Sequence, residues 1–71
     1  MTPKEIAQVQ AYLRNRFSNK KIIIIPRTNK NDSAEVMLDE EFLGVIFRDD
    51  EDGDICYQFN MTMLDIDINL D

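Results

Sequence analysis

The stretch FRDDEDGD, residues 47–54, contains the residue types that could do chemistry. Five carboxylates and one glycine fill positions 49–54. Carboxylates bind calcium in loops of the EF-hand type, which need Asp at the first position, Gly at the sixth and Glu at the twelfth. With Gly53 at the sixth position, Arg48 and Phe59 fall on the two anchoring positions, where neither can serve. The sequence therefore predicts no specific metal site, and weak calcium binding stays an alternative.

The acidic stretch is better explained as the turn of a β-hairpin. A three-residue loop ending at Gly53, with that glycine left-handed, keeps odd-numbered residues opposite odd-numbered ones. It places Phe47 opposite Tyr57 and Val45 opposite Phe59, and both are favourable cross-strand pairs. Such a turn needs one or two acids, so the surplus suggests a contact surface for a protein partner. The candidate partner-binding residues are Asp49, Asp50, Glu51, Asp52 and Asp54.

Catalytic chemistry finds little support in the sequence. Histidine is absent, and the acids cluster in turns where water keeps them ionised. Cys56 is the single cysteine, so an internal disulfide and a thiolate zinc site are both excluded. We expect its thiol to face outward opposite Arg48, a cation that could lower its pKa. The sequence predicts a non-enzymatic protein without a cofactor.

The basic residues are concentrated in the first half of the chain. Residues 1–30 carry seven Lys or Arg and one acid, whereas residues 31–71 carry one Arg and thirteen acids. The basic first half could bind RNA or another anion. Alternatively, the two halves could pack together so that their opposite charges offset each other. The net charge of −6 repels nucleic acid and anionic membranes, which favours the second reading. The anion-binding alternative would use Arg14, Arg16, Lys20, Lys21 and Arg27.

The elements that must position these residues begin with a helix. Thr2 and Glu5 are spaced as a capping box around Pro3, which predicts a helix start there. Apolar residues at intervals of three and four then predict one buried stripe. The stripe contains Ile6, Val9, Leu13 and Phe17.

Strands are predicted after the helix. Residues 22–25 are four isoleucines, which is typical of a strand covered on both sides, and Pro26 marks its end or a sheet edge. Even positions from Ala34 to Leu38 are predicted to face inward. The outward face of the next strand is predicted to carry Phe42, Ile46 and Arg48. The inward rows of the last two strands are then residues 43, 45 and 47, and residues 55, 57 and 59.

These elements predict an α+β fold, with an N-terminal helix on a three- to four-stranded antiparallel meander sheet (α-β-β-β-β) in a single domain. A chain of 71 residues has a modest core, so we expect a homodimer to supplement it. In residues 65–71 the apolar side chains fall on even-numbered positions. This tail either pairs with an edge strand, for example that of a second copy, or is frayed. The first ten residues resemble no signal peptide, and the unpaired Cys56 fits the cytoplasm.

Three stretches carry a family resemblance: PRTNKNDSAEV (residues 26–36), EEFLGVIFRDDEDGD (residues 40–54) and YQFNMTMLDID (residues 57–67). Together with the opening TPKEI and the YLR segment, they resemble a family of short bacterial proteins classed only as a domain of unknown function. The resemblance implies a small cytoplasmic bacterial protein that stands alone. It implies no activity, and no functional residue is carried over. The ending INLD departs from the family pattern.

Overall fold

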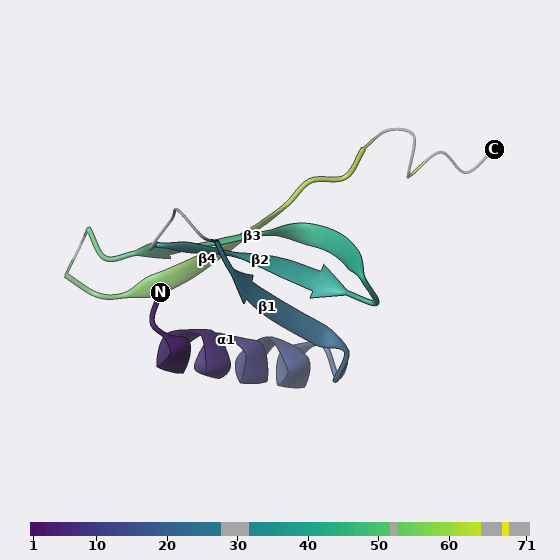
Figure 1. Cartoon of the computed structure of the whole chain (residues 1–71). Helices are drawn as coiled ribbons and strands as arrows, with labels where there is room; N and C mark the ends of the chain where they lie inside the picture. Colours follow the sequence, from purple (N-terminus) through teal and green to yellow (C-terminus); the bar gives the residue numbers. More distant parts are fainter. Residues whose placement is uncertain (28–31, 52, 65–67, 69–71) are drawn as a thin grey trace.

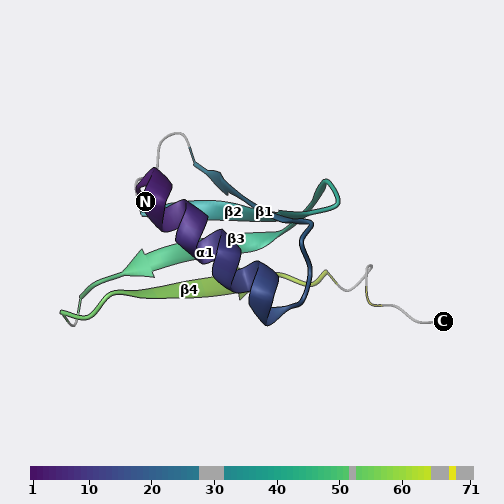
Figure 2. The ribbon, with the colours of Figure 1, turned by 90° about the horizontal axis from the view of Figure 1, so that it is seen from below.

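The computed structural model describes residues 1–27, 32–51, 53–64 and 68. Helix α1 (Pro3–Arg16) precedes strands β1 (Ile22–Pro26), β2 (Ser33–Leu38), β3 (Glu41–Asp49) and β4 (Cys56–Met61). The strands form one antiparallel sheet in the order β1-β2-β3-β4, and α1 crosses one of its faces (Figures 1 and 2). The predicted α+β meander is confirmed. The predictions for residues 65–71 lie outside the described residues, apart from Ile68.

The start of α1 follows the predicted capping box. The Thr2 hydroxyl accepts a hydrogen bond of 3.1 Å from the Glu5 backbone N–H, and Glu5 Oε1 accepts one of 2.9 Å from the Thr2 N–H. These two bonds satisfy backbone donors that no helical turn can reach. The helix ends at Arg16 with Phe17 as its C-cap, and Ser18 takes a left-handed φ of 51° after it. Among the described residues, no helix is long and apolar enough to cross a membrane.

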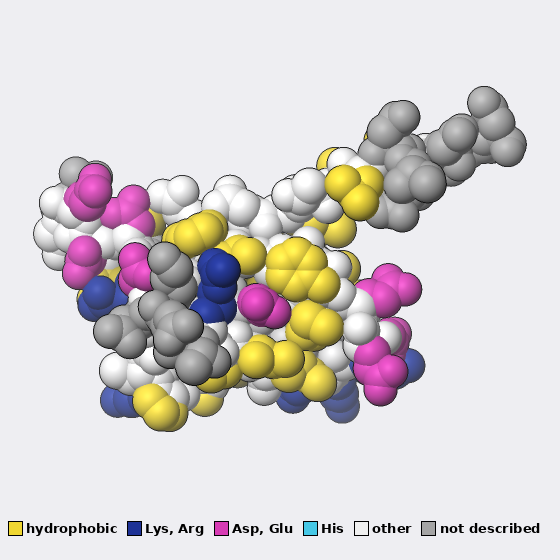
Figure 3. All heavy atoms as spheres, turned by 45° about the horizontal axis from the view of Figure 1, so that its top comes forward, with side chains coloured by type: hydrophobic (Ala, Val, Ile, Leu, Met, Phe, Trp, Pro, Cys, Tyr) yellow, Lys and Arg dark blue, Asp and Glu magenta, His cyan; other side chains and the backbone are white. Residues whose placement is uncertain are grey.

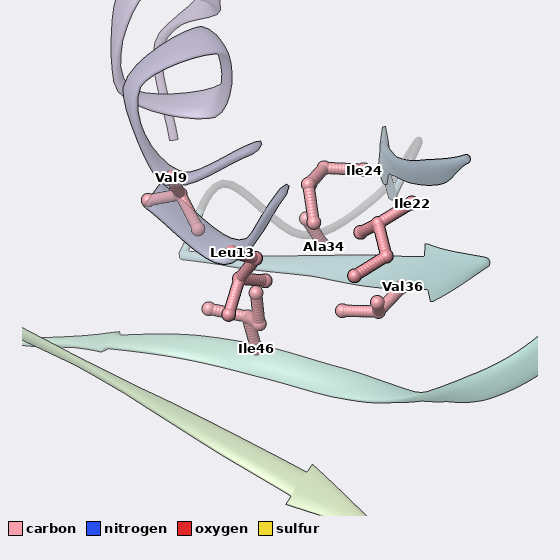
Figure 4. Close-up of a cluster of buried hydrophobic side chains, with 7 residues drawn as sticks. All are labelled: Val9, Leu13, Ile22, Ile24, Ala34, Val36 and Ile46. Atoms are coloured by element: carbon pink, nitrogen blue, oxygen red, sulfur yellow. The ribbon is translucent and has the colours of Figure 1, made fainter. Parts of the chain in front are cut away.

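The core lies between α1 and the near face of the sheet (Figure 4). Two residues of the predicted helical stripe, Val9 and Leu13, are buried there, whereas Phe17 remains mostly exposed at the helix end. Ala34 and Val36 of β2 face them, as the even-numbered pattern predicted. The buried hydrophobic residues are Val9, Leu13, Ile22, Ile24, Ala34, Val36 and Ile46.

Strand β1 is covered on one side only, so the prediction of two covered faces was wrong. Ile22 and Ile24 are 4% and 5% exposed, whereas Ile23 and Ile25 are 49% and 43% exposed. Consecutive residues of a strand point to opposite faces, and α1 is the one layer that packs on this sheet among the described residues. Pro26 does end the strand at a sheet edge, as predicted.

The predicted inward row of β3 was partly wrong. Leu43 packs against the core, but Ile46 is 1% exposed while Phe47 is 40% exposed. A bulge explains the change, because Val36 pairs with Gly44 whereas Met37 pairs with Phe42, which leaves Leu43 as the extra residue. Beyond the bulge the even-numbered residues face α1.

The register between β3 and β4 differs from the prediction by one residue. Tyr57 lies opposite Arg48 instead of Phe47, and Phe59 lies opposite Ile46 instead of Val45. The odd-numbered residues of β4 do face the helix side, as predicted. The last pair joins residues 49 and 56, so the connection is longer than three residues. Gly53 has the expected positive φ, 87°, and its N–H donates to the Asp50 carbonyl at 3.2 Å.

Candidate functional surfaces

A polar cluster joins the start of α1 to the hairpin of β3 and β4. Glu5 Oε2 accepts hydrogen bonds from Arg48 Nε at 2.8 Å and from the Tyr57 hydroxyl at 2.7 Å. Arg48 Nη1 also donates to Asp50 Oδ2 at 2.9 Å. Arg48 therefore lies on the helix side of the sheet, which corrects the prediction that it faces outward. Glu5 thus caps the start of the helix and also fixes it to a hairpin more than forty residues away.

The same contacts shift the acid–base properties of the cluster. The Thr2 backbone hydrogen bond, the Tyr57 hydroxyl and the Arg48 guanidinium together lower the pKa of Glu5 from 4.5 to about 2. The pKa of Arg48 is raised by hydrogen bonds to Glu5 and Asp50, and the pKa of Tyr57 is raised by its hydrogen bond to Glu5. All three shifts favour the bonded protonation states, so the cluster behaves as a structural clamp that stays charged at neutral pH.

The acidic turn projects from one end of the sheet (Figure 1). Asp49 is engaged locally, because its carboxylate accepts from the Glu51 N–H at 3.1 Å and from Gln58 Nε2 at 3.0 Å. Glu51 and Asp54 are exposed, and Asp52 lies outside the described residues. Among the described residues no three acidic, Cys or His side chains are grouped as a metal site. Weak calcium binding and partner binding by this turn both stay predictions.

The basic residues of the anion-binding alternative are divided by the fold. Arg14 Nε donates to the Ile22 carbonyl at 2.7 Å, and Lys21 lies 3.7 Å from Asp39. Arg16 and Lys20 are exposed near the end of α1. Arg27 follows Pro26, which lies beside the start of the helix, so it does not join the others. Anion binding stays a prediction that rests mainly on Arg16 and Lys20.

Cys56 is exposed, as predicted, but its surroundings differ from the prediction. It lies opposite Asp49, whereas Arg48 lies on the other face of the sheet. Arg48, the cation expected to lower the pKa of the thiol, therefore does not lie beside it.

The uncovered face of the sheet is apolar, which the sequence reasoning missed. Its large side chains are half-exposed: Phe42 by 54% and Phe47 by 40%, besides the two isoleucines of β1. The strand pairing places Glu35 between Ile25 and Val45 in the same row. Figure 3 shows apolar side chains spread over this face, with one acidic and one neighbouring basic side chain among them and further charged side chains of both signs at its ends. We call this the open face; it comprises Ile23, Ile25, Glu35, Met37, Phe42, Val45 and Phe47.

The open face reaches the acidic turn. Phe47 belongs to the open face and also lines a shallow depression of about 290 Å³ beside Asp49, Asp50 and Glu51. An apolar surface and a group of carboxylates are therefore continuous at this end of the sheet. The four consecutive isoleucines already indicated that both faces of β1 are apolar. They also suggested a second covering layer, which the described residues do not supply.

A second apolar region lies on the helix side. The helix crosses the sheet diagonally (Figure 2) and leaves a cavity of about 400 Å³ between itself and β4. Ile46 and Phe59 line it from the sheet, and Val9 and Tyr12 from the helix. Tyr57, whose hydroxyl donates to Glu5, also lines it. The cavity holds almost no polar groups, so it offers packing and little recognition chemistry.

Comparison with known proteins identifies the family and no activity. No curated protein and no solved structure matches the chain. A family described as proteins of unknown function, DUF3126, matches residues 5–67, which include α1 from Glu5 onward, the whole sheet and the acidic turn. The chain therefore belongs to the DUF3126 family.

Proposed function

We propose that this chain is a cytoplasmic, non-catalytic protein-interaction module, and that its open face and acidic turn together bind a basic amphipathic segment of a partner. The observation that carries the proposal is the half exposure of four large apolar side chains on one uncovered face, namely Ile23, Ile25, Phe42 and Phe47. A contiguous apolar patch of this kind on a small protein usually marks a contact site. Covering each such side chain would contribute about 1 kcal/mol.

The charges on the open face select the partner. Glu35 lies in the middle of the apolar row, and none of the described cations forms an ion pair with it. Burying a lone carboxylate is costly, so a partner that covers Glu35 must bring a cation to it. The acidic turn at the end of the face favours further cations. An amphipathic helix with Leu on one side and Lys at its border satisfies both requirements and would form a third layer on the sheet.

A calorimetric titration with two designed helical peptides tests the proposal. The peptides have equal length and identical Leu positions, but one carries Lys and the other Glu on its polar face. We expect the wild-type chain to bind the Leu/Lys peptide and not the Leu/Glu peptide. Ile23→Ser combined with Phe42→Ser should weaken binding about 30-fold, since two contacts of about 1 kcal/mol are lost.

A matched control separates the open face from the helix side. Tyr12 is 64% exposed beside the cavity under α1, so Tyr12→Ser removes a similar exposed ring elsewhere. It should leave binding unchanged. The proposal is wrong if the wild-type chain fails to bind the Leu/Lys peptide, or if Tyr12→Ser weakens binding as much as the open-face variant.

The contribution of the acidic turn is measured with the same peptide. Asp49→Asn combined with Asp54→Asn removes two charges and leaves the Arg48–Asp50 pair in place. We expect weaker binding at low salt and a smaller salt dependence, because fewer charges attract the peptide. Unchanged affinity at low salt would remove the turn from the proposed surface.

A further inference from the structure

The two edge strands of the sheet, β1 and β4, differ in how their outward backbone groups are satisfied. At the β1 edge, side chains of α1 bond to the strand: the Ile24 N–H donates to Gln10 Oε1 at 2.9 Å, and the Ile22 carbonyl accepts from Arg14 Nε at 2.7 Å. Pro26 ends that strand without a donor. Two of the backbone groups along β1 that could pair with another chain are therefore occupied by α1, and the donor of Pro26 is missing.

The β4 edge has none of these features. Among the described residues β4 pairs with β3 alone. Its sequence, CYQFNM, contains no charged residue and no proline. Natural edge strands usually carry such residues because unpaired backbone groups invite another strand. Every residue of β4 except Phe59 is exposed. A strand of this kind at an edge is suited to receive a partner strand.

We propose that β4 pairs antiparallel with β4 of a second copy of this chain, so that two four-stranded sheets join into one. A two-fold axis perpendicular to the sheet generates this arrangement and keeps both helices on the same side. Across this contact between the two β4 strands, which we call the seam, odd-numbered residues lie opposite odd-numbered ones and even-numbered residues opposite even-numbered ones. Tyr57, Phe59 and Met61 face their counterparts on the helix side, and the neutral Gln58 and Asn60 face theirs on the other. No like charges meet within the strands.

The distribution of charge favours a second copy as the occupant. The acidic turn lies at one end of β4 (Figures 1 and 2). At the other end, Phe17 and Asn19, which follow the basic last turn of α1, line the same depression as Met61 of β4, whereas the acidic residues 39–41 lie at the connection between β2 and β3. The two-fold axis reverses one protomer, so each acidic turn comes to the end where the partner has its exposed Arg16 and Lys20. Parallel pairing would bring the two acidic turns together. A dimer formed through the open faces would bury Glu35 of both copies in an apolar interface.

The inference is independent of the proposed function, because the edge contact leaves the open face free. Sedimentation equilibrium on the full chain tests it first. We expect a mass of twice 8.3 kDa at high micromolar concentration. Gln58→Lys combined with Asn60→Lys places like charges across the seam and should give the monomer mass.

Ile23→Lys is the matched control, since it adds a cation to the open face at the far edge of the sheet. The Ile23→Lys variant should remain a dimer if the two copies pair through β4. A dimer formed through the open faces would be disrupted by this substitution. A monomeric wild-type chain, or a monomeric Ile23→Lys variant, would overturn the inference. Circular dichroism verifies that each variant retains the fold.

Amide hydrogen exchange on the wild-type chain needs no variant. In an unpaired edge strand every second N–H points to solvent and exchanges quickly. We expect slow exchange at every consecutive amide from residue 57 to residue 61 at a concentration where the mass is dimeric. Alternating slow and fast exchange along β4 at that concentration would show an open edge and refute the pairing.

Discussion

The two faces of this sheet have similar side chains and opposite surroundings. Under α1, Ile22, Ile24 and Ile46 are almost completely buried. On the other side, Ile23, Ile25 and Phe47 remain half-exposed, although each directly neighbours one of those residues in the sequence. The difference is produced by α1, which is the single helix of the described residues and covers only one face. Apolar side chains on the second face therefore lie outside the core and are available for contacts with another molecule.

The strongest test of this difference changes two adjacent residues of β3. Ile46→Ala removes three buried carbons, and we expect it to lower the free energy of unfolding by about 2–5 kcal/mol because a cavity remains. Phe47→Ala removes a larger side chain from the open face and should cost less than about 1 kcal/mol. Urea denaturation followed by circular dichroism measures both. Equal losses would mean that the two faces are equally buried.

Gly44 allows a second comparison, between a crowded and an open position. A Cβ on Gly44 would overlap the Asn60 carbonyl oxygen and approach a Phe59 ring carbon to 2.8 Å, whereas nothing lies within 4 Å of a Cβ on Gly53. Gly44→Ala should therefore destabilise by about 1–3 kcal/mol and displace β4.

Gly53→Ala is its control. It should cost about 1 kcal/mol, because only the positive φ of 87° is strained. Thermal unfolding and backbone chemical shifts distinguish the two variants. Unchanged chemical shifts along β4 in the Gly44→Ala variant would contradict the close contact at Gly44.

The smallest expected effect concerns the Glu5 clamp at the end of the covered face. The folded pKa of Glu5 is about 2, below the ordinary 4.5, so its contribution is complete above pH 4.5 and is lost as the pH falls through 2. Glu5→Gln should lower Tm at pH 7. The difference in Tm from the wild type should shrink between pH 4.5 and 2. A difference that is constant down to pH 2 would show that the carboxylate charge has no part in the clamp.

The predictable part of the fold came from local patterns. Thr2 and Glu5 marked the helix start, the alternation in β2 gave the correct inward face, and the odd-numbered face of β4 was also correct. Each pattern involves residues close in sequence whose types differ clearly between the two faces. The order of strands followed from short connections, which favour antiparallel neighbours.

The errors came from β1 and β3, where both faces are apolar. Alternation cannot assign an inward side when residues such as Ile46 and Phe47 are both hydrophobic. The bulge at Leu43 then changes which residues of β3 face α1, and the local sequence does not predict this bulge. The clamp was missed for a different reason: Glu5 and Arg48 are distant in the chain, and their contact depends on the register that the bulge sets. The open face, as a candidate site, was hidden by the same assumption of a second cover.

The four consecutive isoleucines of residues 22–25 test the difference between the faces most directly. A soluble paramagnetic agent broadens methyl NMR signals that it can approach, and the measurement needs no substitution. We expect the methyl signals of Ile23 and Ile25 to broaden strongly, while those of Ile22 and Ile24, under α1, stay sharp. Equal protection of all four isoleucines in the isolated protomer would contradict the open face and the function proposed for it.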